Sequence, residues 1–178
     1  MDFKTVISSL LKRFGDLHVR YGLMGGFALG LWGAARATVD LDFLVRREDV
    51  EKVALITREL GYEQKFQSEN VSQFVSASNL FGEVDFLHAF RQTSIEMLDR
   101  AVEKEIFDGS IRIKVLLPED LIGLKLQAIK NDPSRKERDL ADIESLVAVQ
   151  KSSLDWALIE SYAGILDASD LLMKIREK

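Results

Sequence analysis

The sequence has 178 residues, 47% of them hydrophobic and 30% charged, with two prolines, two histidines and no cysteine. This composition is typical of one ordered globular domain, with or without a short helical appendage, and excludes disulfides, thiol nucleophiles and cysteine-based zinc sites. The net charge of −5 argues against a general polyanion-binding surface. Residues 1–15 lack the pattern of a signal peptide and no apolar run is long enough to span a bilayer, so we expect a cytoplasmic protein that makes no membrane contact.

The first sixty residues predict helices alternating with short strands. Apolar residues recur at helical spacing from Phe3 to Phe14, and Gly15 is well placed to end that helix. A short apolar run then stops at Gly25-Gly26. In chain order, the expected elements are a helix over 3–14, a strand over 20–24, a short helix over 27–32, a strand over 38–45 and a helix over 48–60.

The remainder predicts further strands followed by helices. β-branched and aromatic residues mark the strands, and a turn at Asp108-Gly109 precedes the last of them. Pro118 suits the first turn of a helix, and Ser134 can cap the next. The expected elements are strands over 73–77, 83–87 and 111–116, helices over 118–130 and 134–149, and two shorter helices beginning at Ser153 and Ala168.

Two carboxylates lie on one face of the strand over 38–45. The two-residue side-chain period sends Asp40 and Asp42 to the face opposite the apolar side chains of Val39, Leu41, Phe43 and Val45. Neighbouring like charges repel, and aspartate is disfavoured inside strands, so a bound cation would compensate them. The alternative is a solvated strand face whose acids protect a sheet edge from aggregation.

A second strand repeats this pattern. Val84 and Phe86 face inward, which places Glu83 and Asp85 together on the opposite face. If the two strands are neighbours, their acids form a cluster of oxygen ligands suited to Mg²⁺ or Mn²⁺, which bind a few carboxylates together with substrate phosphates. Strand alternation alone does not choose between Glu83 and Asp85 as the ligand.

The glycine pair Gly25-Gly26 lies where a strand gives way to a helix. Bare backbone N–H groups at such a point can receive phosphate oxygens. The alternative is a tight turn that simply needs a positive φ.

Together, Leu23-Met24-Gly25-Gly26, then Asp40-Leu41-Asp42 after thirteen intervening residues, then Val84-Asp85-Phe86, resemble the DNA polymerase β-like nucleotidyltransferase superfamily. A closer likeness, to small nucleotidyltransferases of the AbiEii toxin type, is suggested by residues 26–45, 124–128 and 138–143. The resemblance covers about residues 20–145. Gly26 stands where many members have serine, so a hydroxyl that could bond a phosphate is missing.

The resemblance implies an α+β nucleotidyltransferase fold, with a small mixed β-sheet flanked by helices. Residues 1–117 would form the catalytic core and 118–178 a C-terminal helical region packed on it as one compact unit. Gly25 and Gly26 would open the active-site helix and contact the nucleotide. The acids expected to bind metal and carry catalysis are Asp40, Asp42 and Asp85.

Two basic residues are further candidates for contact with the nucleotide. Lys125 shares a helical stripe with apolar residues, so its ammonium needs an anion, which the resemblance implies to be the triphosphate. The alternative is an aliphatic stem packed on the core with the ammonium in water. Arg36 precedes Asp40, and we expect it to reach phosphates and not merely to cover the surface. The pairs Arg135–Asp139 and Arg138–Asp142 stand four residues apart, as in ordinary surface ion pairs.

The predicted activity is that of an enzyme of the EC 2.7.7 type. A nucleoside monophosphate would pass from an NTP, such as ATP, to a hydroxyl acceptor by a two-metal mechanism with release of pyrophosphate. The acceptor stays open between a small molecule, RNA and protein. The alternatives are a metal-dependent glycosyltransferase, a non-catalytic nucleotide-binding module, and a toxin that modifies tRNA or a protein and has an antitoxin partner.

Overall fold

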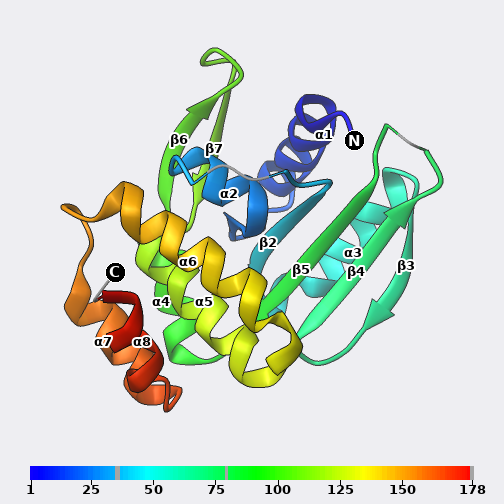
Figure 1. The fold of residues 1–178 in the computed structure, drawn as a ribbon. Helices are drawn as coiled ribbons and strands as arrows, with labels where there is room; N and C mark the ends of the chain where they lie inside the picture. The colour runs from blue at the N-terminus through cyan, green and yellow to red at the C-terminus, as the bar shows by residue number, and fades with distance from the viewer. Residues whose placement is uncertain (35–36, 79, 177–178) are drawn as a thin grey trace. The chain divides into compact units, whose positions relative to one another are not determined.

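The computed structural model describes residues 1–34, 37–78 and 80–176 and divides the chain into two compact units (Figure 1). The first unit consists of Met1–Ala28 and Ala37–Leu116, and the second of Leu29–Arg36 and Leu117–Lys178. The expected organisation into 1–117 and 118–178 as one compact body stays a prediction. Within the described residues, no helix combines the length and apolarity needed to cross a membrane.

The first unit is built on a seven-stranded mixed sheet with the strand order β3-β4-β5-β2-β1-β7-β6 (Figure 1). The pairs β2–β5 and β1–β7 are parallel, and the other neighbouring pairs are antiparallel. The expected combination of a mixed sheet with flanking helices is confirmed. The strands are β1 (Tyr21–Met24), β2 (Asp40–Arg46), β3 (Tyr62–Gln67), β4 (Val71–Ser76), β5 (Glu83–Ala89), β6 (Val102–Ile106) and β7 (Ile111–Val115).

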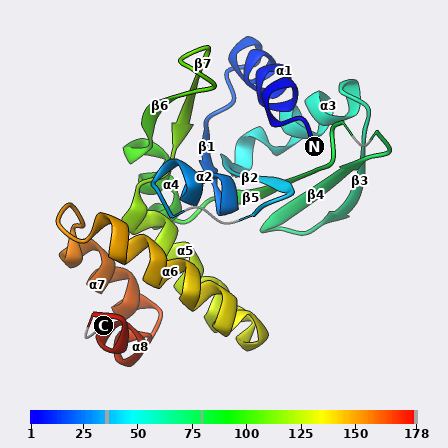
Figure 2. The same ribbon diagram turned by 45° about the horizontal axis from the view of Figure 1, so that its top comes forward.

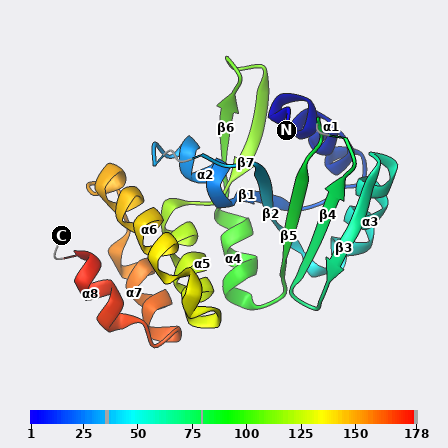
Figure 3. The ribbon, with the colours of Figure 1, turned by 45° about the vertical axis from the view of Figure 1, so that its right-hand side comes forward.

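One face of this sheet carries the main apolar core, covered by α1 (Phe3–Asp16) and α3 (Val50–Glu59) (Figure 3). Phe14 of α1 meets the rings of Phe43 and Phe86, at centroid distances of 5.7 and 6.3 Å. Those two rings come from adjacent positions of β2 and β5 and stack at 5.8 Å. The apolar alternation of both strands is thereby buried, which fixes their register because a one-residue slip would expose it.

The opposite face is covered in part by α4 (Gln92–Arg100). Gly22 of β1 lies beneath it, and a Cβ there would come within 2.5 Å of Leu116 and 3.6 Å of Leu98. Leu44, paired with Gly22, is fully buried on the same face. Asp40 and Asp42 share this face by alternation, and both are partly exposed.

The second unit is helical and contains α5 (Pro118–Asn131), α6 (Lys136–Gln150), α7 (Trp156–Ile165) and α8 (Ser169–Arg176) (Figure 2). Gly123 lets α5 and α7 approach closely, since a Cβ there would lie 2.5 Å from the Tyr162 ring. The Tyr162 hydroxyl donates to Oδ1 of the fully buried Asp120 at 2.5 Å. A short 3₁₀ helix, η2 (Pro133–Arg135), is capped by Asp132, whose side chain accepts from the Ser134 N–H. α2 (Gly25–Leu31) joins the two units along the chain.

Three elements of the first unit were not predicted from the sequence: β3, α4 and β6. β3 and β6 are the two edges of the sheet and expose most of their side chains, so neither shows an apolar alternation. The helix predicted over 48–60 is in fact a 3₁₀ turn, η1 (Arg47–Asp49), followed by α3. Val39 precedes β2 and is 77% exposed, so it does not join the apolar face predicted for it.

Candidate active site

The acids of β2 and β5 occupy matching positions on neighbouring strands. In the parallel ladder Asp42 is paired with Asp85, and Asp40 with Glu83. Paired residues on adjacent strands lie about 5 Å apart and point to the same face. The arrangement therefore gathers two carboxylates at one level of the sheet and two more at the next.

Two of these carboxylates accept hydrogen bonds from neutral side chains. The Thr38 hydroxyl donates to Asp40 Oδ1 at 2.5 Å, and the Gln73 amide donates to Asp85 Oδ2 at 2.9 Å. Gln73 stands opposite Asp85 on β4. Burial raises the pKa of Asp85, an effect that the Gln73 hydrogen bond partly offsets and the nearby charges of Asp40 and Glu83 reinforce.

The strand register brings the acids to neighbouring backbone positions, but their side chains do not converge on one point. Within residues 1–34, 37–78 and 80–176, no three His, Asp or Glu side chains are gathered tightly enough to hold an ion. One oxygen of Asp40 accepts from Thr38, and one oxygen of Asp85 accepts from Gln73. The paired positions of Asp42 and Asp85 suit Mg²⁺, which takes one or two carboxylates and completes its shell with water and phosphate. The three-acid metal cluster stays a prediction.

Gly25 lies directly against one of these acids. It is the first residue of α2, directly after Met24, which is paired with Asp42. Its φ is +69°, and a Cβ on it would lie 1.8 Å from Asp42 Oδ2. The position thus requires glycine both for backbone conformation and for space. Gly26 follows it and is buried in the first turn of α2.

Comparison with known proteins shows the family. A family model described as "uncharacterised nucleotidyltransferase" matches residues 7–176. The chain belongs to this nucleotidyltransferase family. No curated protein matches the sequence.

Solved structures agree on the nucleotidyltransferase fold. The solution structure of the antibiotic-resistance factor ANT(2'')-Ia has a TM-score of 0.67 at 16% identity and covers 99% of this chain and 98% of its own. A nucleotidyltransferase-like protein from Paracoccidioides brasiliensis has a TM-score of 0.58 at 18% identity, covering 99% and 93%. The lincomycin-bound lincosamide adenylyltransferase LnuA has a TM-score of 0.55 at 14% identity, covering 82% and 96%.

In the second unit of this nucleotidyltransferase, Lys125 bonds two buried carboxylates. Its ammonium lies 3.0 Å from Asp139 Oδ1 and 2.6 Å from Asp142 Oδ2, and its side chain is only 11% exposed. Arg135 adds a bond of 2.9 Å to Asp139, as its four-residue spacing predicts, but Asp139 is fully buried and not on the surface. Burial alone would raise the pKa of Asp139, but the bonds from Arg135 and Lys125 outweigh it and hold that pKa below its usual value.

The sequence indicated that a buried lysine needs an anion, and the structure supplies two carboxylates from α6. Contact between Lys125 and a triphosphate stays a prediction. Arg36, the other basic residue expected at the nucleotide, lies outside the described residues. Gln73 was not predicted as a member of the site, because only the pairing of β4 with β5 brings it to Asp85.

Proposed function

We propose that this protein transfers a nucleoside monophosphate from an NTP to a hydroxyl group of an acceptor and releases pyrophosphate. Asp40, Asp42 and Asp85 would bind two Mg²⁺ or Mn²⁺ ions, with Gly25 and Gly26 at the phosphates. The single observation that carries the proposal is the pairing of Asp42 with Asp85, with Gly25 packed against Asp42. Membership of a nucleotidyltransferase family supports it.

The side chains have separable tasks in this proposal. Asp42 would hold its carboxylate at the paired position facing Asp85, within reach of an ion shared by the two strands. Asp85 would accept the proton of the attacking hydroxyl, a role favoured by the raised pKa that burial gives it. When bound, two metal ions at such a site stabilise the attacking and leaving oxygens. Gln73 would orient Asp85 through its amide.

We place a small antibiotic that carries hydroxyl groups first among the acceptors. The support is that ANT(2'')-Ia has been solved in complex with adenylyl-2''-tobramycin and LnuA with lincomycin. The same proteins suggest ATP as the first nucleotide to test. An AbiEii-type toxin that acts on tRNA or a protein, with an antitoxin as partner, is the second candidate for the same chemistry.

The experiment measures thermal stabilisation by each of the four NTPs with Mg²⁺ or Mn²⁺, followed by pyrophosphate release in the presence of candidate acceptors. An Asp40→Asn/Asp42→Asn variant should lose the metal-dependent stabilisation. A Glu51→Gln/Glu63→Gln variant, which removes two exposed acids of the same unit, should keep it.

Each alternative gives a different result. Stabilisation by a UDP-sugar and by no triphosphate would indicate a glycosyltransferase and overturn the proposal. Tight binding of a triphosphate without pyrophosphate release from any acceptor would indicate a nucleotide-binding module.

A further inference from the structure

The sheet face that carries the acids continues from β5 across β4 to the edge strand β3. Gln73 of β4 is paired with Asp85, and Phe66 of β3 is paired with Gln73. Paired residues of adjacent strands point to the same face, so one row of side chains crosses four strands. In order from β3 to β2, this row is Phe66, Gln73, Asp85 and Asp42. Helix α3 lies behind β3 and β4 in Figure 1, on the other face of the sheet.

A register shift in β3 brings the ring of Phe66 to this face. Up to Gln64 the pairing with β4 is regular, and Gln64 stands opposite the buried Phe74. Regular alternation would send Phe66 to that same covered face, two residues further on, but the extra residue Lys65 pairs it with Gln73 instead. Bulges at the edge of a sheet redirect side chains in this way, often beside active sites.

The redirected ring is left open to solvent. Phe66 is 50% exposed, and within residues 1–34, 37–78 and 80–176 it makes no contact with another aromatic ring. By contrast, Phe74 and Phe86, on the other face of β4 and β5, are 3% and 0% exposed. An aromatic ring is stabilised by leaving water, so a ring that a bulge turns outward beside the acids indicates a ligand that covers it.

A second row of paired residues runs beside the first and is acidic. Glu63 of β3 is paired with Val75, Val75 with Glu83, and Glu83 with Asp40. Lys65 approaches Glu63 at 3.8 Å, but both side chains are exposed, so this ion pair compensates the charge only weakly. The carboxylates beside the ring repel a polyanion such as RNA and favour a neutral or cationic ligand.

We propose that this face binds the acceptor, with one ring of the acceptor stacked on Phe66 and its reacting hydroxyl at Asp85. The inference rests on the proposed transferase function: the acceptor oxygen bonds the α-phosphorus, the bond to pyrophosphate breaks, and the hydroxyl proton passes to Asp85. Two strand spacings, about 10 Å, separate Phe66 from Asp85, so the acceptor is longer than a single sugar or aromatic ring. It is a neutral or cationic small molecule of at least two linked rings, and Phe66 determines specificity for it.

The test is calorimetric titration of the whole protein with tobramycin and with lincomycin, in Mg²⁺ and without nucleotide, so that no turnover occurs. We expect at least one of these two probes to bind the wild type, and Phe66→Ala to weaken that binding about tenfold. Phe66→Tyr keeps the ring and should bind the probe as the wild type does. Because Phe66 is half-exposed on an edge strand, both variants should fold normally.

The matched control is Gln64→Ala, which shortens an exposed side chain on the other face of the same strand and should leave binding of the probes unchanged. Metal-dependent stabilisation by NTPs tests the transferase site separately, and Phe66→Ala should keep it.

Three results overturn the acceptor site even where NTPs stabilise the protein. They are a wild type that binds neither probe, a Phe66→Ala variant that binds them as tightly as the wild type, and tighter binding of a single-stranded RNA oligonucleotide than of either probe. A dimer that Phe66→Ala dissociates, measured by light scattering, would assign the ring to a contact between two copies and overturns the site as well.

Discussion

Replacing Gly25 with alanine tests the contact on which the candidate active site depends. The added Cβ would lie 1.8 Å from Oδ2, 2.5 Å from Cγ and 2.8 Å from Cβ of Asp42, so the carboxylate or the start of α2 must move. The φ of +69° adds roughly 1–2 kcal/mol of backbone strain for an L-residue, and overpacking typically adds about 1–3 kcal/mol. We therefore expect Gly25→Ala to lose about 2–5 kcal/mol of unfolding free energy.

The same displacement should affect chemistry more than stability. A misplacement of about 1 Å in a catalytic group can cost on the order of 100-fold in rate, so nucleotidyl transfer should fall by at least that factor in the folded variant. Denaturant unfolding measures the first effect and pyrophosphate release the second. Gly30→Ala is the matched control in the same helix: no atom lies within 4 Å of its Cβ position, so it should be neutral or gain about 0.5–1 kcal/mol. A Gly25→Ala protein with wild-type stability and activity would refute the reasoning.

Three further predictions concern single side chains. Asp85→Asn should abolish pyrophosphate release but keep metal-dependent NTP stabilisation in a thermal shift assay; full turnover would remove Asp85 from the mechanism. Lys125→Met removes the ammonium that bonds two buried carboxylates and should cost about 3–5 kcal/mol in denaturant unfolding, whereas Lys130→Met, at an exposed pair, should cost less than about 1 kcal/mol. Burial lowers the pKa of His88, so the unfolded chain binds its proton more readily and stability falls as the pH drops below about 6.5. His88→Gln should flatten this dependence, measured by urea unfolding at several pH values, while the exposed His18→Gln should not; unchanged slopes in both would contradict the assignment.

His88 shows that strand alternation predicts well which face of a strand a side chain occupies. Alternation along β5 places His88 on the core-facing side with Val84 and Phe86, and it is 5% exposed there. Its Nε2 lies 3.0 Å from the Ser72 hydroxyl and its Nδ1 lies 3.1 Å from the Glu69 carbonyl. Nδ1–H donates to the carbonyl, so the neutral ring accepts from Ser72 through Nε2. These two partners satisfy both ring nitrogens, which accounts for His88 as a structural residue.

The sequence predicted the elements whose patterns are local and strong. The acids of β2 and β5 stand out because the first four residues of each strand alternate between acids that keep some exposure and buried apolar residues. It did not predict β3 and β6, because edge strands bury few side chains and are specified by their neighbours. The partners of Lys125 were missed for a related reason: helical spacing predicts contacts within α6, whereas the contact of α5 with α6 depends on tertiary packing.

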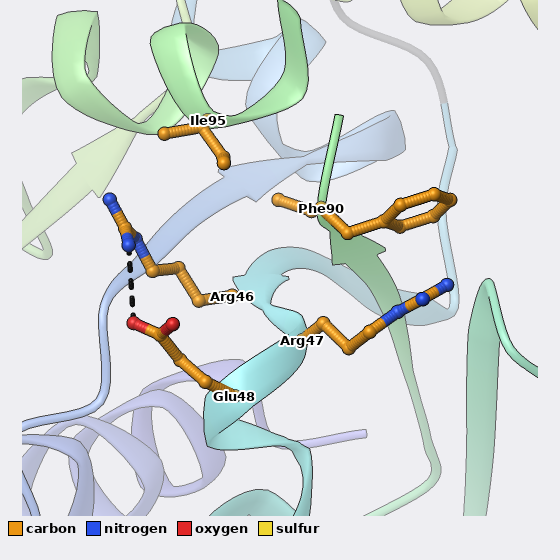
Figure 4. A pocket seen from close by; sticks show the side chains of 6 residues that line it. Arg46, Arg47, Glu48, Phe90 and Ile95 are labelled. Atoms are coloured by element: carbon orange, nitrogen blue, oxygen red, sulfur yellow. Dashed lines mark hydrogen bonds and ion pairs between the residues drawn. The ribbon is translucent and has the colours of Figure 1, made fainter. Parts of the chain in front are cut away.

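β2 carries opposite charges at the two ends of one sheet face. Asp40 and Asp42 stand at its start, the fully buried Leu44 lies between, and Arg46 stands at its end, so a single strand presents charges of both signs on one face. The acidic end can be recognised from the sequence because its two charges stand two residues apart on one strand. The surroundings of Arg46 cannot be recognised in this way, because Phe90, which directly follows β5, and Ile95 of α4 come near it only in the folded chain (Figure 4). The acidic end groups Asp40 and Asp42 two residues apart on one face, so bound cations would relieve their mutual repulsion, as the proposed transferase site requires.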